Sequence, residues 1–378
     1  MSKRIAIDDT ILVAGMPATA GSKMLENFTP LFTAEAVERL TANGYAVAEK
    51  TAVGEFGLDL VGESTTGKLL GDAAEKVAAG TVDAALAVDL NGSPRRAAAL
   101  SDVTFVKPTY GTVSRYGVIS CAASGEQIGV YAKTADSCAE VLAKIAGHDA
   151  KDGTSLRNDS YDYDTALDVQ GTKVAIAKDL YDRADAETKA KIDKFAEALR
   201  AKGVTVEEVA FDFADIANTA WQILMCAETC NNLSRYDGVK FGYRTPNYSN
   251  IDELYVNTRT EAFNFLTKSV IIYGSEALSK GRYTECYDKS LRIRRVIVER
   301  MKAIFASYDA ILAPACKSTS YQAYDCKEAF MKVFAESVFT APASITGMPA
   351  VVSGGVQLMG NYFDESMLLS LAKVTEGV

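Results

Sequence analysis

The stretch VDAALAVDLNGS, residues 82–93, is an apolar run that stops at a polar turn. Its apolar part, Val82 to Leu90, has the length and composition of a buried strand. Asn91-Gly92-Ser93 is typical of a turn, because Gly and Asn accept backbone conformations that other residues avoid. Functional sites of open α/β sheets lie beyond the carboxyl ends of the strands. We therefore predict that Ser93 lies just past the end of a strand, where a site would form.

Strand and helix signals alternate along the rest of the chain. Toward the N-terminus, the pattern predicts a helix that begins at Thr33 and a strand at residues 45–48. Toward the C-terminus, it predicts a strand at residues 173–177, a helix after Asp185 and a strand at residues 204–209. Such an alternation is typical of α/β proteins. We therefore predict an α/β fold with a mixed, mostly parallel sheet surrounded by helices.

The pattern favours one domain over residues 1–378, a length that is sufficient for a large α/β core. Residues 156–172 are polar and rich in Tyr and Asp, which is typical of a surface connection. Residues 216–300, roughly, have a mainly helical pattern. We expect this segment to form a helical lobe over one end of the sheet.

The overall composition disfavours several classes of protein. The formal net charge of −9 disfavours direct binding of nucleic acid, which requires a basic surface. No apolar run has the length of a signal peptide or a membrane span, so we expect a cytoplasmic protein. Cys226 and Cys230 lie one helical turn apart and are candidates for a shared metal. The single histidine and the lack of a CxxC pair favour buried free thiols instead, with no metal and no cofactor.

Four groups of motifs resemble those of the amidase signature family. Within this family they are most similar to the A subunits of the glutamyl-tRNA(Gln)/aspartyl-tRNA(Asn) amidotransferases. The motifs are Gly21–Phe28; Val106–Val118 with residues 127–129 and 147–152; Leu233–Gly242 with residues 252–255 and 258–259; and Val338–Pro342 with residues 347–350. The resemblance covers nearly the whole chain and implies the amidase-signature fold.

The resemblance implies a catalytic relay of two serines and a lysine. In the family, a nucleophilic serine attacks a carboxamide, a second serine at a cis peptide bond passes the proton on, and a neutral lysine is the final base. Residues 89–93 resemble the family's Asp-Thr-Gly-Gly-Ser and put Ser93 at the nucleophile position. The other two positions are changed, because Asp8 replaces the lysine and Leu69 replaces the relay serine. The alternative interpretation of Ser93 is an ordinary turn residue.

The resemblance also implies an oxyanion-binding backbone at Leu90, Asn91 and Gly92. Asn91 stands where the family has a glycine, and Pro94 and Arg96 stand where the family usually has Ile and Gln. Asn tolerates left-handed backbone conformations better than most residues, so we expect the turn to persist.

A pocket for the amino-acid donor is implied at two further positions. Arg294 matches an arginine that, in the amidotransferase relatives, holds the carboxylate of glutamine, a role that suits a bidentate guanidinium. Ser337 stands where the family has an acidic residue for the ammonium group of glutamine. We therefore expect weak glutamine binding. A charge on a helix surface is the alternative interpretation of Arg294.

The changed positions predict a pseudo-amidase, without glutaminase or amidase activity, that acts in binding or assembly. A carboxylate with an ordinary pKa near ~4 is a poor base for a serine proton, and nothing in the sequence indicates strong burial of Asp8. The expected partners are B- and C-type amidotransferase subunits or further copies of the chain. Two alternatives stay open: an active amide hydrolase with a rearranged base, and a module that binds an amino acid or small amide around Arg294.

Overall fold

The computed structural model describes residues 2–61 and 71–376 of the chain. The strands within these residues form one ten-stranded sheet. From one edge to the other, the order is β2 (Ala46–Thr51), β1 (Arg4–Asp8), β3 (Ala84–Asp89), β5 (Gln127–Ala132), β4 (Thr104–Lys107), β9 (Ala350–Ser353), β10 (Val356–Met359), β8 (Ala310–Ala313), β6 (Lys173–Ala177) and β7 (Thr205–Val209).

Parallel and antiparallel strand pairs occupy different parts of this sheet. β1 is parallel to β2 and β3 at one edge, and β6 is parallel to β7 and β8 at the other. The strands between them, from β3 across to β8, pair antiparallel. The α/β class and the mixed sheet are confirmed, but the expected predominance of parallel pairs holds only at the two edges. One of these antiparallel pairs, β9 with β10, follows from a tight turn in which Gly354 and Gly355 both have positive φ.

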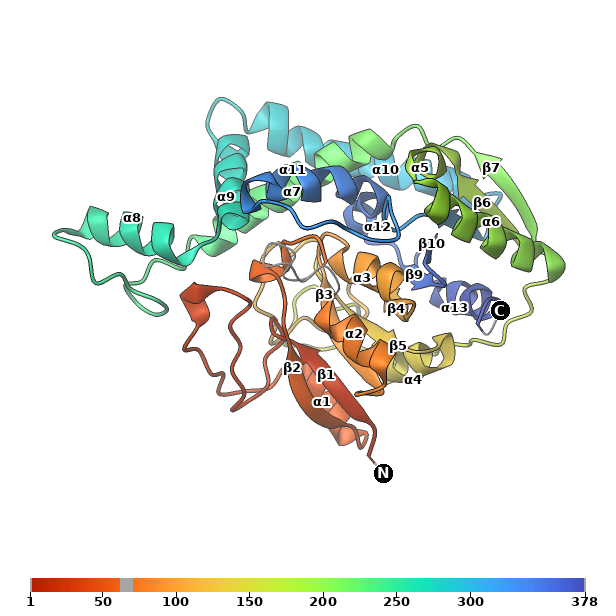
Figure 1. The fold of residues 1–378 in the computed structure, drawn as a ribbon, viewed down its shortest axis with the longest axis horizontal. Helices are drawn as coiled ribbons and strands as arrows, with labels where there is room; N and C mark the ends of the chain where they lie inside the picture. The colour runs from red at the N-terminus through yellow and green to blue at the C-terminus, as the bar shows by residue number, and fades with distance from the viewer. Residues whose placement is uncertain (1, 62–70, 377–378) are drawn as a thin grey trace.

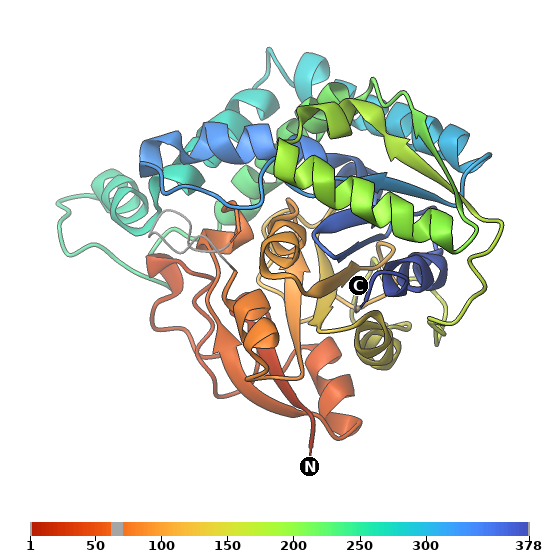
Figure 2. The same ribbon diagram turned by 45° about the vertical axis from the view of Figure 1, so that its right-hand side comes forward.

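Helices cover both faces of the sheet (Figures 1 and 2). The core on one face includes side chains of α1 (Glu35–Ala42), α4 (Ala135–Ile145), α6 (Ala186–Ala201) and α13 (Glu365–Lys373). The core on the other face includes side chains of α2 (Asp72–Ala79), α3 (Ser93–Ser101), α5 (Lys178–Arg183), α11 (Ala329–Glu336) and α12 (Ala341–Thr346).

A group of longer helices lies on the α2 and α3 side, in the segment where the sequence predicts a lobe. These helices are α7 (Ala214–Leu233), α8 (Ile251–Ala262), α9 (Phe265–Leu278) and α10 (Lys289–Phe305). Figure 1 shows α8 projecting away from the body of the protein. α7 and α9 pack closely because Gly274 has no side chain, and a Cβ there would lie 2.0 Å from the Cys226 carbonyl oxygen. Among the described residues, no helix has the length and apolar character needed to cross a membrane.

Two helix starts show how side-chain hydrogen bonds set element boundaries. α6 begins directly after Asp185, as expected, because the Asp185 carboxylate accepts a hydrogen bond from the Thr188 backbone N–H at 2.8 Å. The other helix, α1, begins at Glu35 and not at Thr33. The Thr33 hydroxyl accepts a hydrogen bond from the Ala14 backbone N–H at 3.0 Å, so it is not available to cap α1.

Candidate functional site

The ends of β1 and β3 bring Asp8 and Ser93 to the same small cavity. Asp8 is the last residue of β1, and the parallel neighbour β3 ends at Asp89, just before the turn that leads to Ser93. A cavity of about 30 Å³ lies at these strand ends, and its lining includes Asp8, Thr51 and Ser93. This volume holds about one water molecule. The structure thus brings together two of the residues that the family resemblance singles out.

Asp8 is buried, with 6% of its surface exposed. One carboxylate oxygen accepts hydrogen bonds from the Thr10 backbone N–H and the Thr10 hydroxyl, both at 2.7 Å. The other oxygen accepts a hydrogen bond from the Val88 backbone N–H at 3.3 Å. Burial raises the pKa of the Asp8 carboxyl, while the Thr10 hydrogen bonds and the charge of Lys50 act in the opposite direction. This burial was not expected from the sequence; the carboxylate lies against Thr10 and the β3 backbone at Val88.

Ser93 is the first residue of α3 and is half-buried beside the cavity. It follows Gly92, which has φ of 80°. A Cβ at residue 92 would lie 2.4 Å from the Thr340 Cβ, so only glycine fits here. Ser93 is therefore fixed just beyond the end of β3, at the N-terminus of a helix, as the apolar run and its turn predict.

Asn91 adds contacts to this turn that a glycine could not make. Its side-chain oxygen accepts hydrogen bonds from the Trp221 indole N–H at 2.9 Å and from Gln222 Nε2 at 3.2 Å. Its backbone carbonyl accepts one from the Thr340 hydroxyl at 3.1 Å. Asn91 and the preceding Leu90 are buried. The hydrogen bonds from Trp221 and Gln222 to Asn91 connect the turn to α7.

A buried ion pair between Asp89 and Arg95 connects the residues on either side of the same turn. Both carboxylate oxygens of Asp89 accept hydrogen bonds from Arg95, at 2.8 and 3.1 Å, and both side chains are completely buried. Arg95 also donates to Gln357 Oε1 at 2.8 Å and to the Ser344 hydroxyl at 2.7 Å. This pair was not predicted, although an Asp and an Arg six positions apart on either side of a turn are the available signal.

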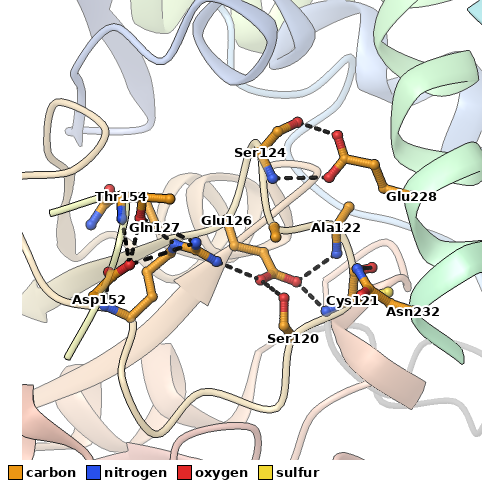
Figure 3. A network of polar contacts seen from close by, with 12 residues as sticks. Ser120, Cys121, Ala122, Ser124, Glu126, Gln127, Asp152, Thr154, Glu228 and Asn232 are labelled. Atoms are coloured by element: carbon orange, nitrogen blue, oxygen red, sulfur yellow. Dashed lines mark hydrogen bonds and ion pairs between the residues drawn. The ribbon is translucent and has the colours of Figure 1, made fainter. Parts of the chain in front are cut away.

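Arg294 lies away from the cavity, on α10, where its Nη2 donates to the Ser124 carbonyl oxygen at 3.2 Å. Ser124 belongs to a loop that Figure 3 shows held by two carboxylates. Glu228 accepts the Ser124 backbone N–H at 2.9 Å, and Glu126 accepts the Ser120 hydroxyl at 2.7 Å and the backbone N–H of Ala122 at 2.7 Å. Arg294 therefore takes part in fixing this loop.

Ser337 is completely buried, and its hydroxyl donates to the Val333 carbonyl oxygen at 2.6 Å. It lies just after α11, donates back to that helix, and is not among the residues that line the Asp8 cavity. The two positions implied for a glutamine donor, Arg294 and Ser337, thus do not share the Asp8 cavity.

Leu69 lies outside the described residues, as does Lys68. The described chain resumes at Gly71, and α2 begins at Asp72. Another lysine that could approach the site, Lys23, instead packs its ammonium group on the Tyr243 ring, 3.9 Å from the ring centre. Where residues are described, none of those lining the cavity is a lysine.

Comparisons with known proteins agree with this architecture. The Amidase family model matches residues 4–68 and 71–369. The A subunit of the glutamyl-tRNA(Gln) amidotransferase of Latilactobacillus sakei subsp. sakei (strain 23K) is 35% identical over 387 residues, covering 96% of this chain and 79% of the relative. The corresponding protein of Agathobacter rectalis (strain ATCC 33656) is 36% identical over 395 residues, covering 97% of this chain and 78% of the relative.

A solved structure shows the same fold at the level of the whole chain. The crystal structure of the glutamyl-tRNA(Gln) amidotransferase A subunit from Thermotoga maritima superposes with a TM-score of 0.81 and 26% sequence identity. The superposition covers 99% of this chain and 82% of that one. The match extends across both edges of the sheet and its helical layers. The chain belongs to the amidase family.

Proposed function

We propose that this protein is a catalytically silent member of the amidase family that acts in binding or assembly. The observation that carries the proposal is the state of Asp8, which stands at the strand end where the resemblance implies the base lysine. Its carboxylate accepts hydrogen bonds from Thr10 and Val88, so both oxygens are engaged in holding the backbone. These hydrogen bonds stabilise the charged carboxylate and so weaken it as an acceptor for the Ser93 proton.

The loss of catalytic turnover expected from the changed positions supports the same conclusion. Removing one member of a hydrolytic triad lowers turnover by a factor on the order of 10⁴–10⁶. Here the base position holds Asp8 and the relay position holds Leu69, which has no proton to pass. The substitution of Asn91 for glycine and its hydrogen bonds to α7 further alter the turn that would bind the oxyanion.

An exposed apolar groove supports a role in assembly. It lies between α8 and α9, has a volume of about 330 Å³ and is lined in part by Tyr255, Val256, Phe263 and Ile272. Val256 is 62% exposed and Ile272 is 71% exposed. Large exposed apolar patches of soluble proteins commonly mark interaction surfaces. B- and C-type amidotransferase subunits are the partners that we propose first, because the relatives are named as subunits; self-association is the second.

The assembly proposal is tested by sedimentation of the chain alone and mixed with B- and C-type subunits. Association that is lost in the double variant Val256→Asp and Ile272→Asp supports it. The matched control replaces Met331, an exposed apolar residue on α11, with Asp. A chain that stays monomeric in every mixture contradicts an assembly role and leaves ligand binding as the remaining form of the proposal.

One observation favours a second candidate, an active amide hydrolase with a rearranged base. Burial raises the pKa of Asp8, and Asp8 shares its cavity with Ser93. A carboxyl with a raised pKa is a better base than an ordinary one. This candidate requires a glutaminase or amidase rate that disappears on Ser93→Ala and also on Asp8→Asn.

A further inference from the structure

Arg96 is a buried guanidinium for which the described chain offers no counter-charge. It lies on α3, three residues after Ser93, and none of its surface is exposed. Its Nε donates to the Leu60 carbonyl oxygen at 2.8 Å, and its Nη1 donates to the Thr340 hydroxyl at 3.0 Å. Its remaining nitrogen, Nη2, is buried and has no hydrogen-bond partner among the described residues. A strong donor group is therefore left unused in the interior.

Arg95 and Arg96 carry the same charge but differ in whether a carboxylate balances it. Arg95 is neutralised by Asp89 at 2.8 Å, whereas within the described residues no carboxylate forms an ion pair with Arg96. Both oxygens of Asp89 accept hydrogen bonds from Arg95, and among the described contacts neither accepts one from Arg96. A guanidinium does not lose its proton in proteins, and an unpaired buried charge is strongly unfavourable. The described part of this site therefore lacks one negative charge.

A second unused donor lies close by. The Nδ2 of Asn91 is buried and finds no hydrogen-bond partner in the described part of the chain, while the Oδ1 of the same amide accepts from α7. The Thr340 hydroxyl connects the two residues, because it donates to the Asn91 carbonyl oxygen and accepts from Arg96 Nη1. Thr340 thus links the Arg96 guanidinium to the backbone of Asn91, the residue that carries the second unsatisfied donor. Both residues depart from the family pattern, which has glycine and glutamine at these positions.

We propose that Arg96 is the receptor for a small anion, of the size of chloride or a short carboxylate, with Asn91 Nδ2 as a second donor. The anion would supply the missing negative charge and accept the hydrogen bond that Nη2 leaves unmade. Anion binding here is independent of whether Ser93 reacts, so it extends the proposed function without relying on it. The altered turn would then serve as a binding element, and the anion would balance a buried charge that the family pattern lacks.

Thermal unfolding tests this proposal with acetate and chloride as separate probes. Each is compared, at equal ionic strength, with the sodium salt of a bulky sulfonate buffer. We expect acetate, chloride or both to raise the melting temperature of the wild-type chain by roughly 2 °C or more, because only the folded state binds the anion. A larger rise with acetate identifies a carboxylate ligand, and an equal rise identifies a simple counter-ion.

The variant Arg96→Gln removes the charge and restores the residue that is usual in the family. It should abolish the anion-specific rise, whereas Arg295→Gln, which changes an exposed arginine on α10, should retain it. A rise of the same size in Arg96→Gln, or no rise in the wild-type chain, overturns the proposal.

Bromide soaked into crystals of the wild-type chain gives a test that needs no variant. An anomalous peak within hydrogen-bond distance of Arg96 Nη2 supports the proposal. Full bromide occupancy at surface positions with none at Arg96 contradicts it.

Discussion

Thr10 donates two hydrogen bonds to one carboxylate oxygen of Asp8, from its backbone N–H and from its hydroxyl, each at 2.7 Å. This arrangement ties the end of β1 to the residues that follow it. The Val88 backbone N–H donates to the second oxygen and ties the same carboxylate to β3. Asp8 thus joins the two parallel strands whose ends frame the cavity beside Ser93. Asp8 stands where the family resemblance implies a base, and its contacts hold the backbone at the ends of β1 and β3.

The pKa of Asp8 gives a first prediction, in which Asp8→Asn changes how stability depends on pH. Burial raises the pKa of Asp8 in the folded chain above its unfolded value, so the folded chain holds the proton more tightly. The resulting stability is present below the unfolded pKa and is lost as pH rises through the folded pKa. Relative to Asp8→Asn, the wild-type chain should therefore lose stability as pH rises from about 4 toward neutrality. Urea unfolding across this range measures the difference; parallel curves for the two proteins would contradict the prediction.

Lys107 gives a second pH prediction, in which burial shifts the pKa in the opposite direction. Burial, with a contribution from the charge of Arg95, lowers the pKa of Lys107 to about 7. Because the unfolded chain holds this proton more tightly, the wild-type chain should gain stability relative to Lys107→Met as pH rises from about 7 to about 10. The neutral amine can still donate to the Met348 carbonyl oxygen, which lies 2.8 Å away. Denaturant unfolding at a series of pH values checks the sign, and a constant difference would show that Lys107 stays charged.

The Asp89–Arg95 pair predicts a large loss of stability when one partner is removed. Arg95→Met leaves the Asp89 carboxylate buried without its counter-charge, so we expect a cost of about 3–5 kcal/mol in the free energy of unfolding. The matched control Arg295→Met changes an exposed residue, and its effect should stay within about 0.5 kcal/mol. Equal effects of the two variants would refute a structural role for the pair.

Much of the architecture could be predicted from the sequence, because the relevant signals are local. The apolar run at residues 82–90 and its turn indicated the strand and the position of Ser93. Asp185 indicated the start of α6 by capping. The helix start at Thr33 was predicted wrongly, because its hydroxyl bonds to Ala14, a contact that depends on how a distant loop folds back. The antiparallel middle of the sheet was missed for the same reason, since strand pairing there depends on contacts between segments far apart in the chain.

The site was predicted in part, and the missing features are those that depend on burial. The identity of Asp8 is visible in the sequence, but its burial between β2 and β3 is not. The inward orientation of Arg96 also could not be inferred, because two adjacent arginines after a turn ordinarily indicate a solvated surface. For Arg95, the available signal was Asp89, six positions earlier. Arg294 was interpreted as a ligand-binding residue or as a charge on a helix surface, and its hydrogen bond to Ser124 depends on a loop far away in the chain.

Restoring the lost relay residues gives a fourth prediction. The double variant Asp8→Lys and Leu69→Ser should fold but remain at background on glutamine and simple amides. Asn91 and its bonds to Trp221 and Gln222 persist in this variant, so the turn that would bind the oxyanion stays altered. The control is the same double variant with Ser93→Ala. Turnover clearly above that control would mean that only the relay, and not the whole site, has been lost.

The most direct test of the silent-site account is the glutaminase and amidase rate of the wild-type chain beside that of Ser93→Ala. Both proteins are assayed for ammonia release from glutamine and from simple amides, without and with B- and C-type subunits. The account predicts equal rates, at background, in every mixture, because Asp8 holds the backbone and does not accept the Ser93 proton. A wild-type rate that exceeds the Ser93→Ala rate by tenfold or more, roughly 1.4 kcal/mol of transition-state stabilisation, would contradict it.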